Sequence, residues 1–94
     1  MKRIPISGLN AFRSVARQGS IRKGAAALEL EPSTVSHQLK ALEAELGTAL
    51  FVRSTRSVSL TDAGRALLES AVPAMEQLEA AVQRSRDAAG TRRG

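Results

Sequence analysis

Three residues divide the first half of the chain into short segments with the character of helices. Glycine readily adopts the left-handed conformation that follows the last turn of a helix, and proline fits the first turn. Gly19, Pro32 and Gly47 stand at these boundaries. Between them apolar residues recur every three or four positions, which predicts amphipathic helices rather than strands. The predicted helices cover residues 6–17, 21–28 and 32–46.

The second and third of these helices are separated by a tight turn. Ser20 is the predicted N-cap of the second helix, because its hydroxyl can accept hydrogen bonds from first-turn amides. Gly24, inside that helix, costs about 1 kcal/mol relative to alanine and indicates that another helix approaches closely. The segment 29–31 is too short to be anything but a turn. Glu31 is a poor N-cap for the third helix, although its charge suits a helix N-terminus.

After Gly47 the pattern changes from helix to strand and back. Residues 51–53 and 58–60 contain β-branched residues and predict two short strands. Thr61 is the predicted N-cap of a long helix over residues 62–87, with Asp62 in its first turn. Pro73 interrupts this helix and should bend it. The tail 88–94 has no apolar pattern and is expected to be disordered.

The composition excludes several classes of site. The chain has 94 residues, enough for one small domain, and 43% of them are hydrophobic. There is no cysteine, which excludes disulfides, a thiolate metal site and a cysteine nucleophile. The single histidine, His37, excludes a zinc site built from several histidines, and any Ser-His-Asp triad would have to use it. We expect no cofactor and no metal.

Neither end of the sequence indicates a membrane or an export signal. No apolar run approaches the roughly 18 residues that a membrane span requires. The basic N-terminus is not followed by the long apolar stretch of a signal peptide. The sequence therefore predicts a soluble cytoplasmic protein.

The positive charge is concentrated in the first two thirds of the chain. Nine lysines and arginines face four glutamates over residues 1–60, whereas the charges from residue 61 onward cancel, so the net charge of +5 lies before the long helix. Localised positive charge favours a polyanionic partner, because contacts with phosphates supply most non-specific affinity for nucleic acid. The alternative is an ordinary solvated basic surface.

The helix predicted over 32–46 has two different faces. One is a core stripe of Val35, Leu39, Leu42 and Leu46. The opposite face is short, polar and nearly free of acid, and it carries Ser33, Ser36, His37, Lys40 and Ala44. A helix that enters the major groove needs small side chains, hydrogen-bonding groups and cations of this kind. The alternative is an amphipathic helix whose outer face meets only water, but the preceding helix and tight turn favour a helix-turn-helix.

The order of these residues resembles the N-terminal DNA-binding domain of LysR-type transcriptional regulators. The resemblance runs from about residue 4 to residue 72 without gaps. It is carried by Leu9, Phe12, Val15, Ala16, Gly19-Ser20-Ile21, Ala25, Leu28, Val35-Ser36-His37-Gln38-Leu39, Leu42-Glu43, Leu46-Gly47, Leu50-Phe51, Arg53, Arg56, Val58 and Leu60-Thr61-Asp62-Ala63-Gly64. Three positions depart from the family pattern: Arg22, Gly24 and Glu31. An acid at position 31 would lower the affinity for the DNA backbone, whereas Arg22 would add a phosphate contact.

The resemblance implies a mainly helical fold with two functional parts. A winged helix-turn-helix over residues 1–61 would consist of three helices and a two-stranded wing at 51–60. A linker helix over 62–87 would join two copies into a dimer that reads a palindromic operator in double-stranded DNA. The family also has a larger C-terminal domain that binds a small-molecule co-inducer. That domain is absent here, so the chain is either a piece of a longer protein or a naturally short variant, and we favour the first.

The family pattern also assigns roles to individual residues. Bases would be read from the start of the third helix, by Pro32, Ser33, Ser36 and His37. Residues suited to phosphate contacts are Ser20, Lys23, Thr34, Gln38 and Lys40. On the wing, Arg53 and Arg56 would reach the backbone and the adjacent minor groove. For Arg53 the alternative is an internal salt bridge, and we favour DNA because no acid lies near the wing in sequence.

The long helix carries a stripe of apolar residues spaced in the manner of a coiled coil. It consists of Leu67, Ala71, Ala74, Leu78 and Ala81. The stripe could simply cover the core of its own domain. Because the helix is too long for a three-helix core to bury, we expect the stripe to pack against a second copy of the chain.

Two other functions compete with DNA binding. The chain could be a helical module whose basic surface binds acidic proteins. It could also be a hydrolase that uses His37, but no orienting carboxylate lies near His37 in sequence and Asp62 is explained by its place in the first turn of the long helix.

Overall fold

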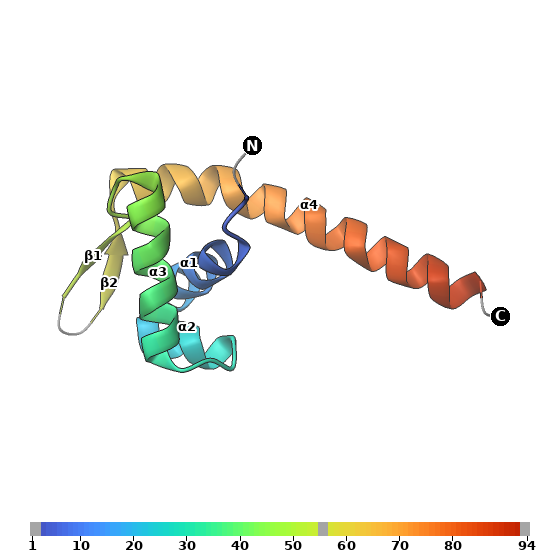
Figure 1. Ribbon diagram of the computed structural model, residues 1–94, viewed down its shortest axis with the longest axis horizontal. Helices are drawn as coiled ribbons and strands as arrows, with labels where there is room; N and C mark the ends of the chain where they lie inside the picture. Colours follow the sequence, from blue (N-terminus) through green and yellow to red (C-terminus); the bar gives the residue numbers. More distant parts are fainter. Residues whose placement is uncertain (1–2, 55–56, 93–94) are drawn as a thin grey trace.

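The computed structural model describes residues 3–54 and 57–92, and it places four helices and one pair of strands within them (Figure 1). This is the mainly helical fold that the sequence predicts, with the elements in the predicted order. The elements are α1 Ile6–Gln18, α2 Ile21–Ala27, α3 Pro32–Leu46, β1 Phe51–Arg53, β2 Val58–Leu60 and α4 Asp62–Arg92.

The predicted helix boundaries are confirmed by the backbone. Gly19 and Gly47 follow α1 and α3 in the left-handed conformation, with φ of 79° and 74°. Ser20 caps α2, because its hydroxyl oxygen accepts a hydrogen bond of 3.1 Å from the Lys23 amide. Pro32 opens α3, and no side chain caps that helix. These local signals fix where α3 begins and ends.

One core holds the three short helices and the first strand together. Its largest fully buried side chains are Phe12, Leu39, Leu42, Leu50, Val15 and Val35. The ring of Phe12 packs at 5.4 Å from that of Phe51, which joins α1 to β1. The predicted core stripe of α3 is wrong at its last member, since Leu46 is 46% exposed. Leu46 is the final residue of α3 and lies one turn beyond Leu42, where the core ends.

Helices α1 and α2 pack as closely as Gly24 indicates. A Cβ atom at position 24 would lie 2.8 Å from Cγ2 and 2.9 Å from Cα of Val15. The hydroxyl of the buried Ser14 donates a hydrogen bond of 2.8 Å to the carbonyl of Gly24 at the same contact. The close approach at Gly24 and the hydrogen bond from Ser14 therefore both fix the orientation of α2 on α1.

The wing is attached to α3 by the carboxylate of Glu43. Strands β1 and β2 are antiparallel, and Phe51 faces Leu60. Oε2 of Glu43 accepts hydrogen bonds from the amides of Leu50 and Phe51 at 2.7 and 3.3 Å. Because Glu43 lies on α3, the start of the wing is tied directly to that helix.

The first turns of α4 pack against the same domain. The hydroxyl of Thr61 donates to the carbonyl of Ala49 at 2.7 Å and accepts from the amide of Gly64 at 3.0 Å, which confirms Thr61 as the cap. Leu67 and Leu68 then pack against the core. The last turns of α4 project from the domain as a long rod (Figure 1).

The end of α4 lies later than the sequence predicts. The helix continues through Arg92, so the disordered tail expected over 88–94 is wrong for its first five residues, and residues 93–94 lie outside the description. The segment 88–94 has no apolar stripe. Ala88 and Ala89 nevertheless have high intrinsic helix propensity, which extends the helix without packing.

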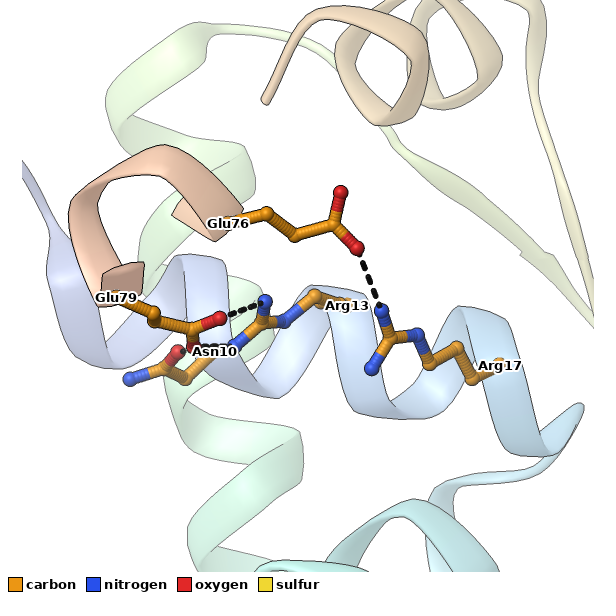
Figure 2. A network of polar contacts seen from close by, with 5 residues as sticks. All are labelled: Asn10, Arg13, Arg17, Glu76 and Glu79. Atoms are coloured by element: carbon orange, nitrogen blue, oxygen red, sulfur yellow. Dashed lines mark hydrogen bonds and ion pairs between the residues drawn. The ribbon is translucent and has the colours of Figure 1, made fainter. Parts of the chain in front are cut away.

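Ion pairs connect α4 to α1 beyond the core (Figure 2). Nη1 and Nη2 of Arg13 donate to the two carboxylate oxygens of Glu79, at 3.1 and 2.5 Å. Arg17 and Glu76 form a second, looser pair at 3.7 Å. The hydrogen bond from Arg13 holds the pKa of Glu79 below its usual value, and the same bond raises the pKa of Arg13.

We predict that Gly64→Ala destabilises the domain by about 3 kcal/mol, at the upper end of the usual cost of overpacking. A Cβ atom at position 64 would lie 2.1 Å from the carbonyl oxygen of Leu50, so α4 would have to move away from the residue that precedes β1. Gly90→Ala is the control, because its Cβ would meet nothing within 4 Å. Urea unfolding measures both, and a Gly64→Ala variant as stable as the original chain would contradict this packing.

We predict that Glu43→Ala costs about 1–3 kcal/mol, because the amides of Leu50 and Phe51 lose a partly buried acceptor. Glu43→Gln should cost less, since its amide oxygen can still accept one of the two bonds. Glu45→Ala removes an exposed neighbouring carboxylate and serves as the control. Amide exchange at Leu50 and Phe51 should accelerate in Glu43→Ala alone, and unchanged exchange there would argue against the attachment.

Candidate nucleic-acid interface

The outward face of α3 is the one that the sequence predicts. Val35 and Leu39 are fully buried on its inner face. On the outer face Pro32, Ser33, Thr34, His37 and Lys40 are exposed, and Ser36 and Gln38 are half-buried. Residues 32–40 of α3 thus present hydroxyl, imidazole and ammonium groups to a partner, with no carboxylate among them.

The start of α2 and the wing share one groove of about 620 Å³. Ser20, Lys23 and Arg53, which the sequence assigns to DNA from separate segments, all line it. The amide of Val58 donates to the carbonyl of Gly19 at 3.4 Å, so the wing is held beside the corner between α1 and α2. Arg22 lines the same groove.

Arg53 has a carboxylate partner that sequence distance conceals. Its Nη2 lies 3.7 Å from Oε1 of Glu43, and its side chain is 31% exposed. The argument that no acid lies near the wing is therefore wrong, because α3 brings Glu43 to it. The pair orients the guanidinium at the edge of the groove and leaves part of it open to solvent. Arg56, the other predicted wing contact, lies outside the described residues.

A second groove, of about 460 Å³, lies between the N-terminal segment and α3. It is lined by Arg3, His37, Gln38 and Glu45, among others. The sequence does not single out Arg3 for the interface, although its place in the basic N-terminus is a signal. The fold brings this cation beside two of the predicted DNA contacts.

The apolar stripe predicted on α4 is divided in the structure. Leu67 packs against the core of its own domain, and Ala71 and Ala81 are half-buried. Ala74 is exposed, and Leu78 is 56% exposed. Val82, which the predicted stripe does not include, is 43% exposed and lines a groove of about 340 Å³ together with Ile6, Met75 and Leu78. Positions 75, 78 and 82 are spaced three and four apart, like the predicted stripe. This spacing is the sequence signal that would have added Val82 to the exposed apolar surface.

The described residues offer little for metal or membrane chemistry. Within residues 3–54 and 57–92 no three His, Asp or Glu side chains gather closely enough to hold a metal ion. No helix in this part of the chain combines the length and the apolar character needed to cross a membrane.

Comparison with known proteins agrees with this geometry. The family model described as a bacterial regulatory helix-turn-helix protein of the lysR family matches residues 6–65. The uncharacterized HTH-type transcriptional regulator y4mQ of Sinorhizobium fredii is 50% identical over 78 residues, which make up 83% of this chain and 26% of y4mQ. The chain thus spans about a quarter of that relative.

Solved structures of two related domains have the same fold. A CbnR DBD–DNA complex superposes with a TM-score of 0.78 at 39% identity, covering 87% of this chain and 94% of that one. A complex of the BenM DBD with catB site 1 DNA gives a TM-score of 0.82 at 27% identity, covering 95% and 96%. The chain therefore belongs to the LysR family of bacterial regulatory helix-turn-helix proteins, and its fold is that of domains solved in complex with DNA.

Proposed function

We propose that this chain binds double-stranded DNA in a sequence-specific manner, as the DNA-binding part of a LysR-type transcriptional regulator. Helix α3 enters the major groove, the wing lies on the backbone and the adjacent minor groove, and two copies act as a dimer on a palindromic site. The winged helix-turn-helix over residues 1–61 supplies recognition, and the linker helix that follows supplies dimerisation.

The observation that carries this proposal is the exposed outer face of α3. Small and hydrogen-bonding residues occupy its first two turns, so its backbone can approach base edges closely. Burial of the opposite face holds this surface outward, which gives a rigid reading element rather than a mobile one. Pro32, Ser33, Ser36 and His37 are the proposed base-reading residues.

Phosphate contacts surround this reading surface. Thr34, Gln38 and Lys40 flank the reading surface on α3. Ser20 and Lys23 line the groove that the start of α2 shares with the wing. Arg53 joins them from the wing, and Arg56 is proposed from sequence alone. Contacts of this kind fix the register on the duplex but carry no sequence information, so specificity rests on α3.

The proposed dimer uses the apolar surface that the domain leaves open. Leu78, Val82 and Ile6 are all about half exposed, and they lie on one groove between α4 and α1. A second copy of α4 would cover them, with Ala71, Ala74 and Ala81 allowing close approach. Leu67, the first member of the predicted stripe, is half-buried against its own core and would offer only its remaining surface to the second copy.

The remaining properties of the family follow as proposals. Because the chain spans about a quarter of y4mQ, a C-terminal domain that binds a small-molecule co-inducer would belong to the whole protein. A regulator of bacterial transcription acts in the cytoplasm, and we propose that location for it. Its relatives are transcriptional regulators, and we propose no catalytic activity for this chain.

Selection of bound duplexes from a random pool tests the DNA-binding proposal. We expect a palindromic consensus, and we predict that Ser33→Glu weakens binding to it by about 1–3 kcal/mol, because a carboxylate then faces base edges and phosphates. Binding to random-sequence duplex should change much less. Fluorescence anisotropy measures both affinities, and circular dichroism checks the fold.

Ser70→Glu is the matched control, since Ser70 is an exposed serine on α4 and receives the same change. A folded Ser33→Glu variant that keeps its full specific affinity would show that α3 is not the reading element. If random-sequence duplex competes as well as the selected site, the chain binds DNA without specificity. If no duplex binds and an acidic protein does, the chain is an interaction module instead.

For the dimer we predict that Leu78→Asp shifts the chain toward monomer in sedimentation equilibrium. A carboxylate buried against the second copy of α4 would lose its hydration without a partner. Ser85→Asp, on the exposed part of the same helix, is the control. A Leu78→Asp dimer as stable as the original would place the interface elsewhere.

A further inference from the structure

Helix α4 contains a weak point between the winged helix-turn-helix, which we call the recognition domain, and the proposed dimer interface. Pro73 has no amide hydrogen, so the carbonyl of Glu69 loses its helical partner and the helix bends more easily there. Before Pro73, Leu67 and Leu68 fasten α4 to the core. After Pro73, the direction of α4 depends on whatever contacts it makes with the domain beyond the proline.

Two ion pairs are the directional contacts among them, and we call Arg13, Arg17, Glu76 and Glu79 the α1–α4 clamp. The arginines are four residues apart on α1 and the glutamates three apart on α4, so each pair of like residues shares one helical face. The two ion pairs, Arg13–Glu79 and Arg17–Glu76, bridge the helices at successive turns (Figure 2).

The ion pair between Arg13 and Glu79 is the more directional of the two. Its guanidinium meets both oxygens of Glu79, and its side chain is only 13% exposed. Oδ1 of Asn10 lies 3.5 Å from Nη2 and supports the guanidinium from the preceding turn. A bidentate arginine–carboxylate contact restricts orientation as well as distance. The clamp therefore holds an angle, not merely a separation.

A small change of that angle has a large effect at the far end of α4. The 19 residues of α4 that follow Pro73, residues 74–92, span about 28 Å at roughly 1.5 Å per residue. A swing of about 10° over that length moves the end by about 5 Å, which exceeds one base-pair step of about 3.4 Å. In a two-fold dimer, such a swing changes the separation of the two recognition helices.

We propose that the α1–α4 clamp fixes the angle between the recognition domain and α4, and thereby determines which spacing of half-sites the dimer accepts. This inference rests on the proposed function. The clamp residues are positioning residues that touch no base. Glu79, Arg17 and Glu76 are exposed, and ion pairs with exposed partners add little to folding stability, so breaking the clamp changes geometry while the domain stays folded.

The test uses duplexes that carry two inverted copies of the selected half-site, with spacers that differ by single base pairs. The original chain should prefer one spacing sharply. In Arg13→Glu and in Glu79→Arg, the affinity ratio between the best spacing and its neighbours should fall by about threefold or more. The double variant Arg13→Glu with Glu79→Arg should restore it, because the pair re-forms with its charges exchanged. Affinity for a single half-site should stay constant throughout.

Glu69→Arg is the matched control, since it makes the same change of charge on α4 before Pro73. Glu69 takes part in no side-chain hydrogen bond or ion pair within the described residues. Its spacing preference should match that of the original chain. A broadened preference in Glu69→Arg, or no rescue by the double variant, would show that charge on α4 acts in a general way and would overturn the clamp.

A distance measurement tests the clamp without DNA. The chain has no cysteine, so spin labels can be attached at Ala27→Cys and Ser85→Cys, both at exposed positions. Labelled chains diluted in excess unlabelled chain report the distance within one copy. The distribution should broaden in Glu79→Arg and narrow again in the double variant, and an unchanged distribution would overturn the clamp. Failure of the original chain to bind any paired half-sites would instead contradict the proposed function, while the label distances still decide on the clamp.

Discussion

Burial of one face of α3 against α1 is the interaction on which the rest of the structure depends. Val35, Leu39 and Leu42 share a core with Phe12 and Val15, and all five are essentially inaccessible to solvent. A helix that buries one stripe presents the opposite stripe by necessity. The polar residues of the first two turns therefore face outward because the opposite face is buried. No contact made by these residues themselves is needed to expose them.

The wing and α4 take their positions from the same helix and the same core. Glu43 is on α3, yet its carboxylate holds the first amides of β1 and faces the guanidinium of Arg53. Thr61 then connects the end of the wing to α4 through the carbonyl of Ala49. Groups from distant parts of the sequence thus form one surface, because each is fastened to an element that the core already orients.

The sequence predicts those features that depend on neighbours along the chain. Ser20, Pro32, Gly47 and Thr61 act at the helix ends where their local chemistry places them. Leu46 shows the limit of periodicity, since a repeat of three or four residues predicts a direction but does not say how far the core extends.

Contacts between distant residues could not be predicted in the same way. Glu43 lies ten residues before Arg53, and Arg13 pairs with Glu79 across 66 positions. Charges carry no periodic signal of their partners, because only the fold decides which of several acids each arginine meets. The family resemblance gives the frame of the site, but it does not report these pairs.

The pairs also change the meaning of the chain's positive charge. The excess before residue 61 suggests a uniformly basic domain, but three of its arginines face carboxylates. Arg13 and Arg17 pair with acids of α4, and Arg53 pairs with Glu43. Among the described residues before position 61, Arg3, Arg22, Lys23 and Lys40 are exposed and form no ion pair. Counterion release depends on cations that reach phosphates, so under the proposed function these exposed residues would drive association, and the paired arginines would set the geometry in which they act.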